Sequence, residues 1–85
     1  MSEDTRYGKL SDNITAARHL LWVGGYDEGF QPGGFEQQLI ETFLRADMHN
    51  TERLLQGFPH YRIPLEMMRN SGGVALNDWV KGQSS

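Results

Sequence analysis

The fold class is decided by residues 35–46, which read FEQQLIETFLRA. Phe35, Leu39 and Phe43 recur every four residues, and Ile40 and Leu44 lie beside them. This spacing places all five side chains on one broad face of an α-helix, with the charged and amide side chains on the other side. We therefore predict that residues 35–46 form the central core helix.

Two more helices are expected after this one. Asp47 is a preferred N-cap, because its carboxylate accepts hydrogen bonds from the free N–H groups of a first helical turn. It predicts a helix over residues 48–58 with almost no connecting loop. Beyond Pro59 the apolar spacing indicates another helix that ends near residue 70. Pro64 lies inside that spacing, so this helix is either kinked there or begins at Pro64, and we favour the later start.

The N-terminal half contains one helix and one long loop. Apolar residues at helical spacing predict a helix over residues 12–23, with Ser11 or Asp12 as its N-cap. Residues 24–34 contain five glycines and one proline, a composition typical of a loop. We expect the side chains of Tyr26 and Phe30 to pin this loop to the core.

The C-terminal residues form a short apolar element. Gly72 and Gly73 separate it from the preceding helix, and we expect one or two helical turns that dock Trp79 on the core. The sequence thus predicts an all-α fold, a compact bundle of three main helices and a short C-terminal helix, with the Gly-rich loop between the first two helices. We expect one domain over residues 1–85, with a flexible arm at 1–10 and a frayed tail at 81–85.

Composition excludes several classes of protein. The chain has no cysteine, which removes disulfides, thiolate metal sites and a cysteine nucleophile. No apolar run is long enough to span a membrane, and the acidic first residues do not resemble a signal peptide. We expect a cytoplasmic protein with no membrane association. The net charge of −3 offers no dense positive patch for a phosphate backbone.

No catalytic, metal or cofactor site is predicted. His19, His49 and His60 are too far apart in sequence to form the tight pairs typical of zinc sites. The Gly-rich loop lacks the Gly-Lys-Ser/Thr ending of a phosphate-binding loop, and no serine lies in a Gly-x-Ser-x-Gly turn. We therefore expect a protein that is not an enzyme and that needs no cofactor.

Three short motifs follow one another in the middle of the chain: Gly34-Phe35-x-x-x-Leu39-Ile40-Glu41, Ala46-Asp47-x-x-Asn50-x-x-Arg53-Leu54 and Gly57-Phe58-Pro59-x-Tyr61. This pattern resembles that of small hypothetical proteins of actinobacteriophages. Pro64 departs from it, because the pattern usually continues helically there. No activity is established for those proteins, so no catalytic residue carries over. The resemblance implies a phage protein that acts in the cytoplasm of a bacterial host, by binding a host protein to modulate host physiology or to counter a defence system.

Protein binding is the function that we expect, because aromatic and arginine side chains are enriched at interface anchors. The expected partner-binding residues are Tyr26, Phe30, His49, Asn50, Arg53 and Tyr61. Trp22 and Trp79 are expected to fill the core instead. Two alternatives stay open. One is an acidic helical regulator that reads nucleic acid with the 48–58 helix, and the other is a homodimer that covers leftover apolar surface.

Overall fold

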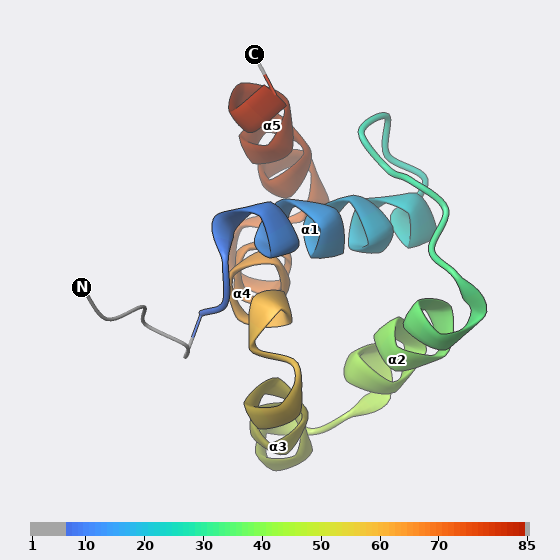
Figure 1. Cartoon of the computed structure of the whole chain (residues 1–85), viewed down its shortest axis with the longest axis vertical. Coiled ribbons are helices and arrows are strands. Elements are labelled where there is room, and N and C mark those ends of the chain that lie inside the picture. The colour runs from blue at the N-terminus through green and yellow to red at the C-terminus, as the bar shows by residue number, and fades with distance from the viewer. Residues whose placement is uncertain (1–6, 85) are drawn as a thin grey trace.

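Five α-helices and one short 3-10 turn form the computed structural model, which describes residues 7–84 (Figure 1). The elements are α1 (Leu10–Gly24), α2 (Gly34–Arg45), α3 (Met48–Gly57), η1 (Pro59–Tyr61), α4 (Arg62–Ser71) and α5 (Gly73–Ser84). No strand occurs in this part of the chain, so the predicted all-α class is confirmed. The structure has five helices where a bundle of three main helices and a short fourth was predicted, and the C-terminal helix is not short.

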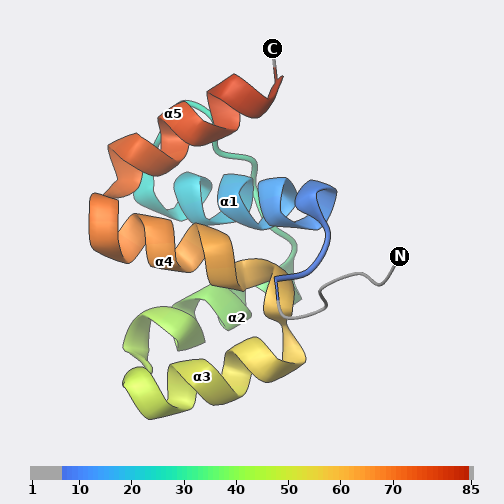
Figure 2. The ribbon, with the colours of Figure 1, turned by 90° about the vertical axis from the view of Figure 1, so that its left-hand side faces the viewer.

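Helix α1 lies between α4 and α5, and it packs against both of them. Seen from the side, α5, α1 and α4 form the upper part of the molecule, while α2 and α3 lie below them (Figure 2). The Cα radius of gyration is 12.1 Å. That value is close to the roughly 12 Å expected for a compact chain of this length.

The core is built mainly from α1, α2 and the segment that follows α3. Phe43 and Tyr61 are its largest aromatic members, and their ring centroids lie 5.2 Å apart. The buried apolar side chains are Ala16, Ala17, Leu20, Leu21, Leu39, Ile40, Phe43, Leu55, Tyr61, Leu65, Leu76 and Val80. Phe35 and Leu44 were both predicted on the core face of α2, but they are 62% and 50% exposed. The buried face of α2 is therefore narrower than the spacing alone suggested.

Helix α1 begins earlier than predicted. Its N-cap residue is Lys9, which makes no side-chain capping bond, so neither Ser11 nor Asp12 is the cap. The amide of Asn13 instead donates to the backbone oxygens of Tyr7 and Lys9, at 2.9 and 2.7 Å. These bonds tie residues 7–9 to the helix, and Leu10 is already helical, so this part of the predicted arm is ordered. Residues 1–6 lie outside the described residues.

Pro64 is neither a kink nor the first residue of its helix. Helix α4 begins at Arg62, directly after η1, and Pro64 is its third residue. The first four N–H groups of an α-helix have no partner within the helix, so a proline in this turn removes no hydrogen bond. A start at Arg62, two residues before Pro64, therefore loses no helical hydrogen bond, and the favoured start at Pro64 is wrong.

The C-terminal element is also longer than expected. Helix α5 has 12 residues and continues through Lys81–Ser84, so the frayed tail predicted for these residues is wrong, and Ser85 lies outside the described residues. Trp79 is partly buried against the core, as predicted. Trp22 is not a core residue, because 38% of its surface is exposed at the end of α1.

Residues 25–33 connect α1 to α2 and lie against α1 and α5. Gly25 ends α1 in the left-handed conformation, with a φ of 79°. A side chain at Gly29 would overlap the backbone of Trp22, so the loop approaches α1 more closely than any other residue allows. The Glu28 N–H donates to the Asn77 side-chain oxygen of α5 at 2.9 Å.

None of the helices within residues 7–84 is both long and apolar enough to cross a membrane.

Candidate functional site

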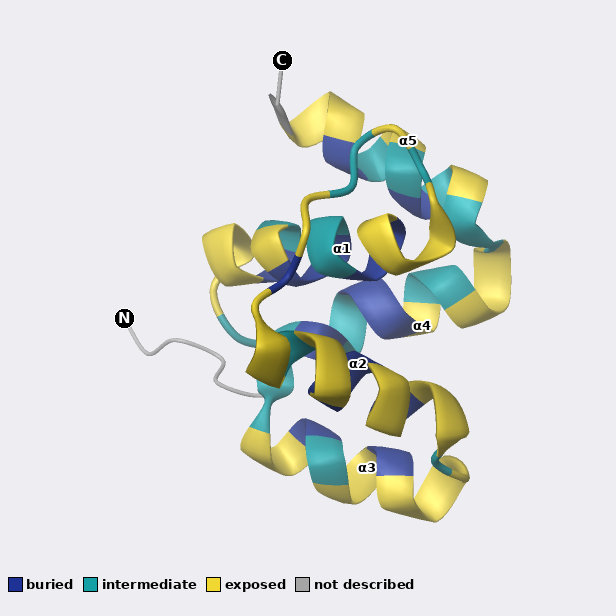
Figure 3. Cartoon of the chain, turned by 90° about the vertical axis from the view of Figure 1, so that its right-hand side faces the viewer, coloured by how far each residue is buried: buried dark blue, intermediate teal, exposed yellow. Residues whose placement is uncertain are grey.

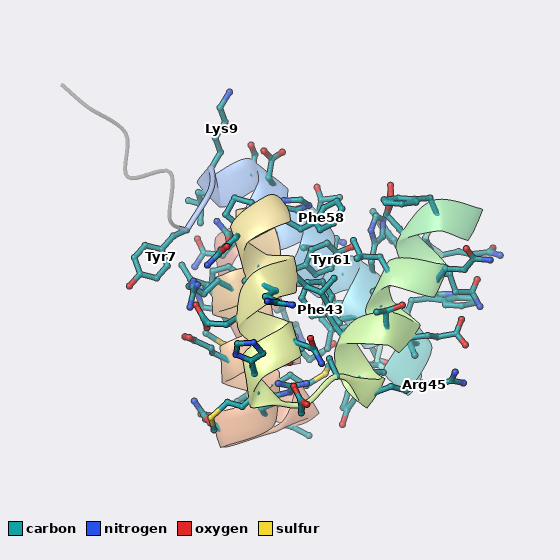
Figure 4. All side chains as sticks on the ribbon, turned by 90° about the horizontal axis from the view of Figure 1, so that it is seen from below. Tyr7, Lys9, Phe43, Arg45, Phe58 and Tyr61 are labelled. Atoms are coloured by element: carbon teal, nitrogen blue, oxygen red, sulfur yellow. The ribbon has the colours of Figure 1, made fainter. Side chains whose placement is uncertain are left out.

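A groove of about 460 Å³ lies between α2 and α3. Its lining comes from Thr42 and Arg45 of α2, Ala46 of the junction, and Asn50, Arg53 and Leu54 of α3. Viewed from below, Phe43 and Tyr61 lie between the two helices, and Arg45 projects from the end of α2 into solvent (Figure 4).

The two arginines of this groove differ from the others that the structure describes. Arg18 lies 4.5 Å over the Phe30 ring and 3.9 Å from the Glu28 carboxylate. Arg62 donates to the Glu52 carboxylate, and Arg69 donates to α2 and α3. Within residues 7–84, by contrast, Arg45 and Arg53 make no ion pair or hydrogen bond, although Glu41 lies one turn before Arg45 on α2. The groove thus carries two guanidinium groups whose hydrogen-bond donors are free.

Arg69 of α4 fixes the geometry of the groove. Its guanidinium donates to the backbone oxygen of Phe43 at 2.7 Å and to the hydroxyl oxygen of Thr51 at 3.3 Å. The Phe43 oxygen belongs to the last turn of α2, where it also accepts from the Ala46 N–H at 3.3 Å and where a cation is favourable. One side chain therefore joins the end of α2 and the start of α3 to α4.

The junction between α2 and α3 follows the predicted capping. The Asp47 carboxylate accepts a hydrogen bond from the Asn50 N–H at 2.8 Å, which confirms Asp47 as the N-cap of α3. Only Ala46 and Asp47 separate the two helices. Two exposed apolar side chains flank this junction, Leu44 at 50% and Met48 at 88%. The outer surface of α2 is exposed along its length (Figure 3).

The predicted partner-binding residues lie in different places. Asn50 and Arg53 line the groove, and His49 is exposed on the same helix. Phe30 is 59% exposed but lies on the loop beside Arg18, and Tyr26 is partly buried against the core. Tyr61 is 1% exposed, so its prediction as a contact residue is wrong: its ring packs on Phe43 instead.

A second cavity, of about 250 Å³, lies where α1, α2 and η1 meet. Its lining is rich in ionisable side chains: Asp12, Thr15, Ala16 and His19 of α1, Glu36 of α2, and His60 and Tyr61 of η1. Asp12, Thr15, Ala16 and His19 follow one another at helical spacing, which is the one sequence signal that could have indicated this cavity. Glu36 and His60 join them only through the tertiary fold.

The pKa values of this cavity reflect its partial burial. Burial lowers the pKa of His19, an effect that the nearby Glu36 carboxylate opposes and His60 reinforces. Burial, together with the negative charge of Glu36, raises the pKa of Tyr61 to about 12. The Oε2 atom of Glu36 is buried and has no hydrogen-bond partner. The cavity therefore holds an unsatisfied carboxylate beside groups that favour their neutral forms.

The histidines do not meet at one point. His19 and His60 line the second cavity, while His49 lies on α3. Within the described part of the chain, no three histidine, aspartate or glutamate side chains are arranged to hold a metal ion.

Comparison of the chain with protein families, curated proteins and solved structures finds no match.

Proposed function

We propose that this chain is a non-enzymatic binding module that attaches to an acidic segment of a partner protein through the groove between α2 and α3. The observation that carries the proposal is the pair of arginines, Arg45 and Arg53, that lack partners at the same groove. An arginine that only solubilises a surface can lie anywhere on it. Two free guanidinium groups on residues that line one groove can both bind carboxylates of the same partner segment.

The rest of the lining fits a protein segment. No carboxylate lines the groove, so nothing in it competes for the two arginines. Leu54 and Ala46 supply apolar contact, and the Asn50 amide can both donate and accept a hydrogen bond. The volume of about 460 Å³ lies within the range of roughly 300–1,000 Å³ that binding pockets occupy. The exposed Leu44 and Met48 side chains at the junction add apolar anchors.

The biological setting of the proposal comes from the resemblance to actinobacteriophage proteins. On that reading the partner is a host protein in the bacterial cytoplasm, and binding modulates host physiology or blocks a defence system. The absence of a nucleophile paired with a base in either cavity lining supports a role without catalysis.

Nucleic acid is the alternative ligand, because Arg53 and Asn50 are also suited to base edges and phosphates. Both side chains, however, line the groove between the helices. Two arginines also fall short of the dense positive patch that a phosphate backbone favours. We therefore expect protein to be the ligand, and we keep nucleic acid as an outcome of the test.

The test is capture from an actinobacterial lysate on the tagged chain, with and without nuclease treatment, followed by mass spectrometry. We expect one stoichiometric protein that survives nuclease and that is lost from the double variant Arg45→Glu/Arg53→Glu. The matched control is Lys9→Glu/Lys81→Glu, which changes the net charge equally on exposed residues that do not line the groove.

Three outcomes would contradict the proposal. Retention by the groove variant would place the binding surface elsewhere, and loss from both variants would mean that only overall charge matters. Loss on nuclease treatment would identify nucleic acid as the ligand. Light scattering of the isolated chain tests self-association. A stable dimer that the groove variant disrupts would show that a second copy of the chain, not another protein, occupies the groove.

A further inference from the structure

The cavity between α1, α2 and η1 has the opposite charge character from the groove. Two carboxylates, Asp12 and Glu36, line it, and no lysine or arginine does. The remaining ionisable groups are His19 on α1 and His60 and Tyr61 on η1. The two carboxylates, with no lysine or arginine beside them, give the lining a negative character.

Glu36 is the central group of this cavity. Its Oε2 atom is buried and accepts no hydrogen bond, even though two imidazoles and a phenol line the same space. A buried polar atom without a partner is costly, and a charged one more so. The position near the N-terminus of α2 offsets part of this cost through the helix dipole. It does not supply the missing hydrogen-bond donor.

The neighbouring rings are arranged to remain in place. The His60 ring lies 4.8 Å from the Tyr61 ring and 6.4 Å from the Phe58 ring. A Cβ at Gly8 would lie 3.0 Å from the Cα of His60, so the chain just before α1 packs closely on this side of η1. The imidazole is thus held by aromatic contacts and by the N-terminal segment, and its position does not depend on a bond to Glu36.

We propose that this cavity binds a small organic cation with several N–H donors, such as a guanidinium or a primary ammonium group. Glu36 is its counter-ion, Asp12 adds negative charge, and the ring nitrogens of His19 and His60 are available as hydrogen-bond acceptors. The His60 ring at the same cavity offers the aromatic surface that such cations favour. A volume of about 250 Å³ leaves room for the tip of an arginine side chain or for a free amine.

The two sources of this chemistry, a free molecule and a side chain of another protein, are separated by two probes. Methylguanidinium chloride represents the free cation, and a capped Gly-Arg-Gly peptide represents the side chain. Binding is followed through the imidazole proton resonances of His19 and His60, with His49 on α3 as an internal reference. We expect saturable shifts at His19 and His60 and none at His49. Saturation with the peptide as well as the free cation would identify a side chain as a competent source.

The variant Glu36→Gln removes the charge and keeps the shape of the side chain, so it should abolish saturation. Glu41→Gln is the matched control, because it makes the same change on an exposed residue of the same helix. If Glu36→Gln did not fold, Asp12→Asn would serve as the second variant. It should weaken binding without abolishing it, because the Glu36 counter-ion remains. The groove variant Arg45→Glu/Arg53→Glu should bind the cation normally, because it changes another site.

Protonation gives the binding a distinctive pH dependence. The titratable groups that line the cavity are Asp12 and His19 on α1, Glu36 on α2, and His60 and Tyr61 on η1. As the pH falls, the His19 imidazole, whose pKa is lowered by burial, gains a proton and becomes a cation that repels the ligand. We expect the cation to bind more weakly at pH 5.5 than at pH 8, because a protonated imidazole carries the same charge as the ligand.

Three results would overturn the proposal. Shifts that stay linear with probe concentration would show that no site exists, and equal saturation of the wild type and Glu36→Gln would show that Glu36 is not the counter-ion. Saturation with zinc ions but with neither organic cation would replace the proposal with a metal site.

Discussion

Arg69 has a larger structural role than its position on an exposed turn suggests. It satisfies a terminal carbonyl of α2 and a hydroxyl on α3 from a third helix, α4. Replacing it by methionine keeps the length of the side chain but removes both bonds. Hydrogen bonds to a charged group contribute about 1.5–3 kcal/mol. We therefore expect Arg69→Met to lower the free energy of unfolding by about that amount.

Urea denaturation measures this effect. Arg53→Met is the matched control, because Arg53 has no partner within residues 7–84 and its loss should change stability by less than about 0.5 kcal/mol. Equal destabilisation by the two variants would contradict the role given to Arg69.

Tyr61 links burial to alkaline stability. Burial raises its pKa in the folded protein to about 12, while an unfolded tyrosine ionises near pH 10. The unfolded chain therefore loses this proton first as the pH rises, so the folding stability from this group is present below about pH 10 and is lost as the pH approaches 12.

Tyr61→Phe removes the ionisable hydroxyl and keeps the ring that packs on Phe43. We expect the melting temperature of the variant to fall less steeply than that of the wild type between pH 10 and pH 12. The other tyrosines and the lysines are common to both proteins, so the difference between the curves isolates Tyr61. Parallel curves would contradict the raised pKa.

At the scale of single elements, Asp47 sets the start of α3. Its carboxylate accepts from the Asn50 N–H at 2.8 Å in the first turn. Loss of such a cap costs about 1 kcal/mol, so Asp47→Ala should lower the free energy of unfolding by about that amount. Asp47→Asn keeps an acceptor oxygen and should stay close to the wild type. Thermal unfolding followed by circular dichroism compares the three proteins, and an unaffected Asp47→Ala variant would remove the cap from the account.

The extent of α5 is tested by Gly82. This residue lies inside the helix, and a Cβ there would meet no other atom within 4 Å. Because glycine loses more backbone entropy than alanine in a helix, Gly82→Ala should stabilise the protein by up to about 1 kcal/mol. If residues 81–84 were frayed, as the composition of the tail suggested, the substitution would leave the unfolding midpoint unchanged.

The elements that sequence reasoning predicted well are those specified by local chemistry. The spacing of residues 35–46 and the cap at Asp47 led to helix boundaries within one residue of α2 and α3. The misses concern features set by tertiary contact. Trp22 is apolar, which favours the core, but it lies on the exposed side of α1. Tyr61 is amphipathic, which is compatible with a surface, but its ring is buried against Phe43. The predicted start of the helix at Pro64 is wrong because the 3-10 turn η1 leads directly into α4 at Arg62.

At the scale of the whole molecule, the fold separates two kinds of charge. The groove between α2 and α3 has two free arginines and no carboxylate, while the cavity beside η1 has two carboxylates and no arginine or lysine. The groove was partly predictable, because Asn50 and Arg53 share one helical face and follow a predicted cap. The cavity was not, because His19, Glu36 and His60 are distant in sequence and meet only when α1, α2 and η1 pack together.

The central claim is that the groove between α2 and α3 contacts the partner protein. Its most direct test is an NMR footprint, in which the amide resonances of the isotopically labelled chain are followed while the captured partner is added. We predict shifts or broadening concentrated at residues 42–54, with α1 and α5 unaffected. Changes confined to α1, α5 or the loop at residues 25–33 would contradict the claim and move the binding surface to the opposite end of the molecule.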